Sequence, residues 1–125
     1  MKNDMNDCIF CKIIAGEIPC KKVYEDEDLF AFHDINPMAP VHFMVVPKQH
    51  IASLAEADAS HAPVLGKLFA KLGELAKSQD LTDGFRTIIN TGRVGRQEVY
   101  HLHVHIVGGP SRRSRIFPRD AGTRP

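Results

Sequence analysis

The sequence has no tryptophan, only three cysteines and almost no net charge. Its 16 basic and 15 acidic residues give a formal net charge of +1, so there is no electrostatic case for a protein that coats DNA or RNA. No run of about 18 apolar residues is present, and the sequence therefore predicts no membrane-spanning segment. The odd number of cysteines argues for reduced thiols or metal ligands rather than for a disulfide framework.

The length of 125 residues suits a single domain and leaves little room for a second. We expect its core at residues 8–109 and a C-terminal tail, rich in glycine, proline and arginine, at residues 110–125. The arginines of this tail are more typical of a solvated segment than of a nucleic-acid site. The start of the chain, MKNDMNDCIFCKII, contains acidic residues and no long apolar run, so it does not resemble a signal peptide and we expect a cytoplasmic location.

Hydrophobic periodicity predicts an α+β domain with a five-stranded antiparallel sheet, one long helix and one short helix. The short helix is expected over Cys8–Ile14 and the long one over Pro63–Lys77. The apolar face of the long helix comprises Leu65, Leu68, Phe69, Leu72, Leu75 and Ala76. Strands are expected at Lys22–Glu25, Leu29–His33, His42–Val46, Phe85–Asn90 and Glu98–Val107.

The last expected strand contains three histidines at alternate positions, in the stretch VYHLHVHIVGG. Since successive side chains of a strand point to opposite faces, His101, His103 and His105 are expected on one face and the intervening apolar residues in the core. A solvated face would explain one histidine, but three in strict alternation favour a metal site or a nucleophile with partners. A neutral imidazole is nucleophilic near neutral pH, and a second imidazole can transfer a proton there.

The loop before this strand, Thr91–Gln97, offers groups that suit a phosphate. Asn90 and Gln97 carry amide groups, and Gly92 and Gly95 expose backbone N–H groups. A plain flexible loop is an equally good interpretation, because the spacing of the glycines is not that of a nucleotide-hydrolase phosphate loop.

The stretch HLHVHIV followed by two glycines matches the His-x-His-x-His pattern and resembles the histidine triad family. The segment CIFCKIIAGEIPCKKVYEDEDLFAFHDINPMAPVHFMVVPKQHI resembles the N-terminal half of the nucleotide-binding branch of that family, in its bacterial form with C-x-x-C. The resemblance spans residues 8–109. It implies a homodimer, no organic cofactor, and hydrolysis at the α-phosphorus of purine nucleotides, notably adenosine phosphoramidates and aminoacyl-adenylates.

Matched position by position, the resemblance implies three catalytic histidines. His103 would be the nucleophile that becomes transiently nucleotidylated before water releases the mononucleotide. His105 would contact the phosphate, and His101 would support the strand and orient its neighbours. Positive charge on His105 and N–H donors near Gln97 would stabilise the phosphate oxygens, and Glu98 or a histidine would protonate the leaving amine.

The resemblance also implies a nucleoside site. Asp34 would take the ribose hydroxyls, although without the resemblance it would be interpreted as a turn residue. His42 matches a family position near the triad, and is equally explained as a strand histidine with a satisfied hydrogen bond. An apolar clamp around the base would comprise Ile9, Phe10, Ile13, Phe32 and Ile35, most of which would otherwise be assigned to the core. The other nucleotide contacts implied are Asn90, Gln97, Glu98, His103 and His105.

A structural zinc site is implied by some members of the family. Its ligands here would be Cys8 and Cys11 of the C-x-x-C, His50 of PKQHI and His101. Two thiolates and two imidazoles make a closed tetrahedral site, which adds to folding free energy. The C-x-x-C alone is ambiguous, and free thiols remain the alternative. Cys20 has no matching partner.

The sequence departs from its nearest relatives within the family at three places. Glu98 stands where serine is often found, Arg96 stands where glycine is common, and the tail is longer and richer in arginine. Two other functions are weighed: a non-catalytic nucleotide-binding or partner-binding dimer, and a dinucleoside polyphosphate hydrolase. A nucleotidyl transferase is disfavoured because His105 is retained, and a zinc-only module would leave His103 without a role.

Overall fold

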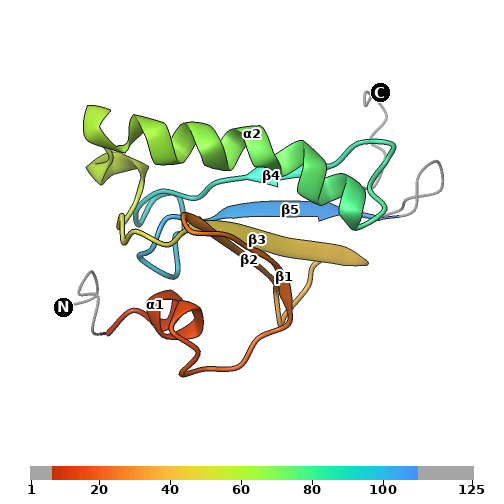
Figure 1. Ribbon diagram of the computed structural model, residues 1–125, viewed down its shortest axis with the longest axis horizontal. Coiled ribbons are helices and arrows are strands. Elements are labelled where there is room, and N and C mark those ends of the chain that lie inside the picture. Colours follow the sequence, from red (N-terminus) through yellow and green to blue (C-terminus); the bar gives the residue numbers. More distant parts are fainter. Residues whose placement is uncertain (1–6, 110–125) are drawn as a thin grey trace.

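The computed structural model describes residues 7–109, so the tail expected at residues 110–125 lies outside the described part. A sheet forms the middle layer, with the long helix α2 on one face and the short helix α1 on the other (Figure 1). The elements in chain order are α1 (Ile9–Ile14), β1 (Lys22–Glu25), β2 (Leu29–His33), β3 (Val41–Pro47), the 3₁₀ turns η2 (Leu54–Glu56) and η3 (Ala59–His61), α2 (Ala62–Ser78), β4 (Arg86–Ile88) and β5 (Val104–Gly108). The predicted α+β class is confirmed.

The five strands form one antiparallel sheet in the order β1-β2-β3-β5-β4. β3 and β5 lie at its centre, and their register pairs Met44 with His105 and Val45 with Val104. This pairing places His42 and His105 in neighbouring strands.

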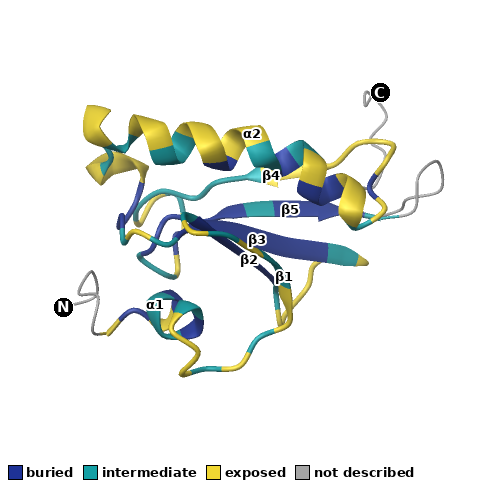
Figure 2. Ribbon diagram, viewed as in Figure 1, coloured by how far each residue is buried: buried dark blue, intermediate teal, exposed yellow. Residues whose placement is uncertain are grey.

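Alternation along the strands divides the buried residues into two clusters (Figure 2). The cluster beneath α2 consists of Leu29, Ala31, Phe43, Val45, Leu68, Leu72, Leu75, Ala76, Leu81, Val104 and Ile106. The cluster on the α1 side consists of Cys8, Phe10, Ile13, Phe30, Phe32, Met44 and Val46. One strand such as β2 contributes to both, because its successive side chains point to opposite faces.

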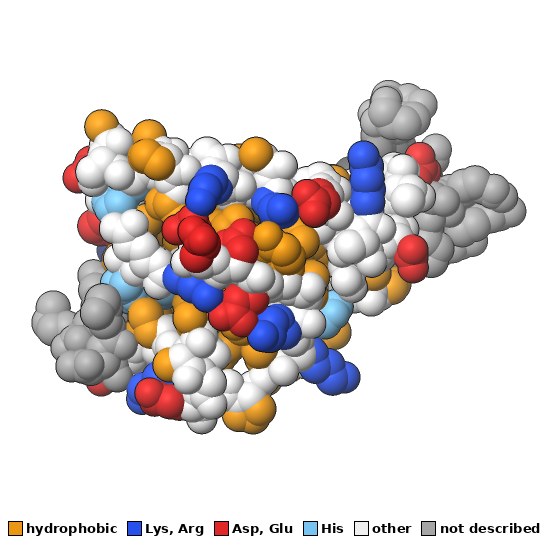
Figure 3. All heavy atoms as spheres, in the orientation of Figure 1, with side chains coloured by type: hydrophobic (Ala, Val, Ile, Leu, Met, Phe, Trp, Pro, Cys, Tyr) orange, Lys and Arg blue, Asp and Glu red, His pale blue; other side chains and the backbone are white. Residues whose placement is uncertain are grey.

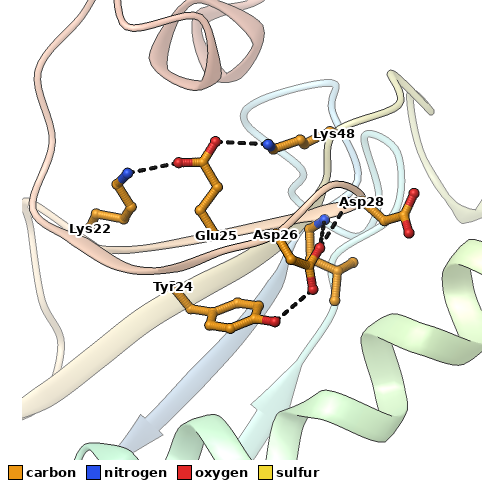
Figure 4. Close-up of polar contacts among 7 residues, drawn as sticks. Lys22, Tyr24, Glu25, Asp26, Asp28 and Lys48 are labelled. Carbon is orange, nitrogen blue, oxygen red and sulfur yellow. Dashed lines mark hydrogen bonds and ion pairs between the residues drawn. The ribbon is translucent and has the colours of Figure 1, made fainter.

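The turn between β1 and β2 is closed by one carboxylate (Figure 4). Asp26 Oδ1 accepts the backbone N–H groups of Asp28 and Leu29, each at 2.8 Å, and its other oxygen accepts the Tyr24 hydroxyl at 2.7 Å. Beside it, Glu25 pairs at 2.7 Å with Lys48, which comes directly after β3. The hairpin is thereby tied to the segment that carries His50.

The predicted strand over Glu98–Val107 is wrong in its first half, because β5 begins only at Val104. Pro47 ends the neighbouring strand β3 and has no N–H with which to continue the ladder. The Leu102 N–H instead bonds the Ile51 carbonyl at 2.7 Å, and the His101 ring bonds the Pro47 carbonyl. His101 and His103 therefore lie in the irregular segment just before β5, outside the strand pairing.

Two smaller expectations also need correction. The strand expected over Phe85–Asn90 is reduced to the three residues of β4. Helix α2 confirms the expected long helix, with a proline in its first turn and Lys77 in its last. The prediction for Phe69 is wrong, because its side chain is 46% exposed and not buried with the apolar face.

The surface shows charges of both signs interspersed rather than gathered by sign on the face seen in Figure 3. Ion pairs such as Lys67 with Asp28 and Lys22 with Glu25 account for part of this mixture. No helix within residues 7–109 is long and apolar enough to cross a bilayer.

Candidate active site and metal centre

A cavity of about 550 Å³ lies on the α1 side of the sheet. Its apolar lining includes Ile9, Phe10, Ile13, Phe32, Ile35, Met44 and Val99, and its polar lining includes Asp34, His42, Asn90, Arg96, Glu98, His103 and His105. Helix α1 has only six residues and cannot cover the whole face, which leaves this space open. An apolar pocket with a few convergent polar groups suits a small-molecule ligand.

The hydrogen bond of His103 fixes which of its nitrogens carries the proton. His103 Nδ1 lies 2.7 Å from the His101 carbonyl oxygen, and since a carbonyl only accepts, Nδ1–H must be the donor. In the neutral ring the lone pair is then on Nε2. Burial lowers the pKa of His103, although that hydrogen bond and the carboxylates of Asp34 and Glu98 act the other way. The ring is therefore neutral near pH 7 and available as a nucleophile or base.

His42 and His105 form a hydrogen-bonded pair beside His103. The Met38 backbone N–H donates to His42 Nδ1 at 3.1 Å, so His42 Nε2 carries the proton of the neutral ring. His42 Nε2 lies 2.9 Å from His105 Nδ1 and donates to it, which leaves the proton of His105 on Nε2. The rings of His103 and His105 are 4.9 Å apart. His105 is thus prepared as an N–H donor beside His103.

The surroundings of His105 disfavour the positive charge that the sequence analysis expects on this residue. Burial lowers the pKa of His105 to about 4, and the neighbouring rings of His103 and His42 add to this, against the opposing effect of Asp34. The ring is therefore neutral at pH 7, and its contribution to an oxyanion is a hydrogen bond rather than a full charge.

Asp34 holds its place at the end of β2 through local bonds. Its Oδ1 accepts the Asn36 N–H at 2.8 Å, and its Oδ2 lies 3.4 Å from His42 Nε2. The carboxylate faces the same cavity as His103, with lone pairs left for further donors. This arrangement fits a pair of hydroxyl groups.

Gln97 lies outside the cavity lining, unlike the neighbouring Asn90 and Glu98. Its amide nitrogen donates to the Ala52 and Val99 carbonyls at 2.8 and 3.0 Å, and its oxygen accepts the Gly92 N–H at 2.9 Å. Its own N–H bonds the Gly92 carbonyl. Gln97 therefore anchors the loop, and its donors are already used within the protein.

A second group of side chains lies beside the cavity, at the start of α1. The Sγ atoms of Cys8 and Cys11 and the Nδ1 atoms of His50 and His101 all lie within 4.8 Å of one another. The sulfur of Cys8 is 3.3 Å from His101 Nδ1, and that of Cys11 is 3.4 and 3.5 Å from the His50 and His101 Nδ1 atoms. Tetrahedral zinc with ordinary bond lengths holds a sulfur and a nitrogen about 3.5 Å apart.

The second nitrogen of His101 supports this interpretation. His101 Nε2 lies 2.7 Å from the Pro47 carbonyl and so carries the proton, which turns the lone pair of Nδ1 toward the two thiols. Burial and the adjacent Cys8 thiol raise the pKa of Cys11 to about 12, so the Cys11 thiol stays protonated until a cation replaces its proton. Among residues 7–109 these four side chains form a group that could hold a metal ion.

Sequence reasoning left two interpretations of His42 open, and the structure combines them, since His42 is both hydrogen-bonded and part of the cavity. It missed Met44 and Val99 as lining residues. Met44 had a usable signal, because it lies two positions after His42 and so on the same face of β3. No signal in the sequence indicated that the Pro47 carbonyl would be the hydrogen-bond partner of His101.

An antiparallel sheet with a histidine-lined cavity and a Cys/His cluster defines a small binding or catalytic protein centred on histidine. A sequence model of the family described as "Scavenger mRNA decapping enzyme C-term binding" matches residues 7–116. Protein HitA of Neisseria gonorrhoeae is 57% identical over 106 residues, which cover 85% of this chain and 99% of that protein.

Two further relatives carry more descriptive names. The 14 kDa zinc-binding protein of Zea mays is 47% identical over 108 residues, covering 85% of this chain and 84% of that protein. The crystal structure of the HIT family hydrolase from Legionella pneumophila Philadelphia 1 superposes with a TM-score of 0.79 at 40% identity, over 82% of this chain and 93% of that chain. The chain belongs to the histidine triad (HIT) family.

Proposed function

We propose that the protein is a purine nucleoside phosphoramidate hydrolase, acting on AMP–amine conjugates and aminoacyl-adenylates. The observation that carries the proposal is the hydrogen bond from His103 Nδ1 to the His101 carbonyl, which leaves an unprotonated Nε2 at the cavity wall. The related Legionella protein is named a hydrolase, which supports the class of reaction.

The proposed reaction has two displacements at phosphorus. His103 Nε2 attacks the α-phosphorus and forms a P–N bond, while the bond from phosphorus to the amine breaks and the amine leaves with one added proton. We assign delivery of that proton to Glu98, which lines the cavity with His103. Water then attacks the same phosphorus and returns a proton to Glu98, AMP departs, and His103 returns to its neutral form.

The remaining cavity residues would position the nucleotide. His105 Nε2–H would donate to a non-bridging phosphate oxygen in both steps. The purine would lie against the apolar wall of Ile9, Phe10 and Phe32, and the ribose hydroxyls would donate to Asp34. Because the Asp34 carboxylate is within 3.4 Å of His42, ribose binding and the histidine pair are physically linked.

We further propose that Cys8, Cys11, His50 and His101 hold a structural zinc ion, as the name of the maize relative suggests for that protein. A closed four-ligand site supplies folding energy and no open coordination position. It would fasten helix α1, which walls the cavity, to the segment that carries His103. We also expect one domain, a homodimer and a cytoplasmic location.

Release of AMP from an adenosine phosphoramidate tests the function. The wild type should turn over and His103→Ala should not. With substrate labelled at the phosphorus, a rapidly quenched wild-type reaction should leave label on the protein in a linkage that survives base and breaks in acid, as a phosphoramidate does.

His61→Ala is a matched control, because His61 lies at η3, outside the cavity lining. It should keep both turnover and labelling. If wild-type protein binds AMP and shows neither turnover nor label, the protein is a nucleotide-binding module and the hydrolase proposal is wrong.

A further inference from the structure

The loop that ends at Gln97 is a rigid feature on the rim of the cavity. Gln97 exchanges two bonds with Gly92, one through its backbone N–H and one through its side-chain oxygen, both at 2.9 Å. Its amide nitrogen fastens the loop to the Ala52 carbonyl at 2.8 Å. A fourth bond joins the Arg96 N–H to the Arg93 carbonyl at 3.0 Å. The loop therefore holds Arg96 in a fixed position.

Arg96 occupies a backbone conformation that disfavours it. Its φ of +63° lies in the left-handed region, where glycine is at ease and a residue with a Cβ is strained. The residue before it, Gly95, is required, because a Cβ there would lie 2.3 Å from the Thr91 carbonyl oxygen. Strain of this kind, kept where the loop meets a cavity, is typical of a functional position.

Arg96 also supplies a charge that nothing else in the cavity does. Among the described lining residues it is the one lysine or arginine. Burial lowers the pKa of His42 and of His105, which keeps this histidine pair neutral near pH 7. Arg96 is therefore the permanent cation of this site.

The other walls of the cavity already have occupants in the proposed complex. The base takes the apolar wall on α1 and β2, the ribose takes Asp34, and the phosphorus lies at His103. Arg96 and Glu98, which are both exposed, lie on the rim and are left to face the group that departs from phosphorus. An arginine there would attract an anion and repel a cation.

We propose that Arg96 selects substrates whose leaving group carries a negative charge, as in an AMP phosphoramidate of an amino acid with a free carboxylate. This inference rests on the proposed hydrolase function. Arg96 takes no part in bond making: the P–N bond breaks as described above, and the guanidinium pairs with the unreacting carboxylate. A phosphate on the leaving group offers the same chemistry, so the test includes both sources.

Leaving groups of similar length and different charge provide the test. We would measure kcat/KM for AMP phosphoramidates of glycine, propylamine and ethylenediamine, whose free ends are negative, neutral and positive, and for diadenosine triphosphate as the phosphate source. Relative to propylamine, Arg96→Gly and Arg96→Asn should each lower the value for an anionic leaving group about tenfold, the size of one exposed charge-assisted hydrogen bond. The value for ethylenediamine should rise, because the positive charge of Arg96 no longer repels it, and Arg96→Lys should restore part of the preference.

Arg93→Ala is the matched control, because it removes the same charge from the same loop at a residue that does not line the cavity. It should leave every ratio unchanged. If kcat/KM falls only for the glycine phosphoramidate, the anion that Arg96 binds is a carboxylate. If it falls only for diadenosine triphosphate, the anion is a phosphate. Ratios identical in wild type and Arg96→Gly would overturn the inference while propylamine turnover still upheld the hydrolase function, whereas no turnover of any substrate would reject the function itself.

Discussion

The two faces of the sheet are built from the same strands and differ in almost every physical property. The α2 face is a closed apolar layer, in which Phe43, Val45 and Leu68 have no exposed surface. The α1 face mixes apolar residues with the histidines and cysteines and encloses the cavity. The difference follows from the helices that cover the two faces, since α2 has 17 residues and α1 has six.

The comparison shows how one sheet separates stability from chemistry. A long helix excludes water and contributes apolar burial, whereas a short helix leaves space for a ligand. Although α1 covers its face of the sheet only in part, His103 and His105 are buried enough that desolvation lowers their pKa values. The α2 face should therefore govern unfolding and the α1 face should govern turnover.

The largest expected effects come from one truncation on each face. Leu68→Ala, beneath α2, should lower the free energy of unfolding by about 3 kcal/mol, because it leaves a cavity in a closed core. It should change kcat/KM of the folded protein little. His103→Ala should lower kcat/KM by about 10³-fold or more and change the unfolding free energy much less. Urea denaturation and steady-state kinetics measure both, and equal losses of activity would contradict the separation of the two faces.

Zinc binding should stabilise the α1 side of the protein, where the Cys/His cluster lies. At a free zinc concentration of about 100 times the Kd, binding should raise the unfolding free energy by about 2.7 kcal/mol. Cys8→Ser should abolish most of this gain, and Cys20→Ser, a cysteine outside the cluster, should retain it. Thermal denaturation with zinc and with chelator, together with metal analysis, would measure the effect. A wild type that gains nothing from zinc would favour free thiols.

Acid should weaken the α1 face through His105. The pKa of His105 is about 4 in the folded protein, chiefly because the ring is buried, and near 6.5 in the unfolded chain. Between these values the unfolded state binds more protons, so stability is fully present above about pH 6.5 and falls as the pH drops toward about 4. In chelator-treated protein, His105→Gln should show a shallower fall than the wild type. Parallel stability curves would argue against this origin.

The smallest effect is expected at Phe69, on the outer side of α2. Its side chain is 46% exposed in the single chain, so Phe69→Ser should cost well under 1 kcal/mol. Denaturation at several protein concentrations would measure this. A larger loss that depends on concentration would show that a second copy covers Phe69, and would support the expected homodimer.

Local sequence patterns were sufficient for most of the fold. The helix over Ala62–Ser78 and the strands over Lys22–Glu25 and Leu29–His33 follow from spacing and turn residues alone. The expected strand start at Glu98 is wrong because hydrophobic periodicity shows only that a segment is able to form a strand. It does not describe whether a partner strand continues beside it, and Pro47 ends the partner here.

The sequence analysis predicted which residues lie near one another better than it predicted their states. It named several of the residues that line the cavity with His103, but it assigned His105 a charge and Gln97 a phosphate contact. Both properties depend on neighbours far apart in the chain. His105 is neutral because it is buried against His42, 63 residues earlier, and Gln97 is engaged by Ala52, 45 residues earlier.

The sequence by itself determined the class of fold, the alternation that separates core from cavity, and the residue types able to attack phosphorus or bind a metal. These depend on local geometry and on side-chain chemistry, which every residue carries with it. Only the tertiary structure decided which nitrogen of His42, His101 and His103 holds the proton. The carbonyls of His101 and Pro47 and the N–H of Met38 make those decisions, and backbone groups take up such positions only when the chain folds.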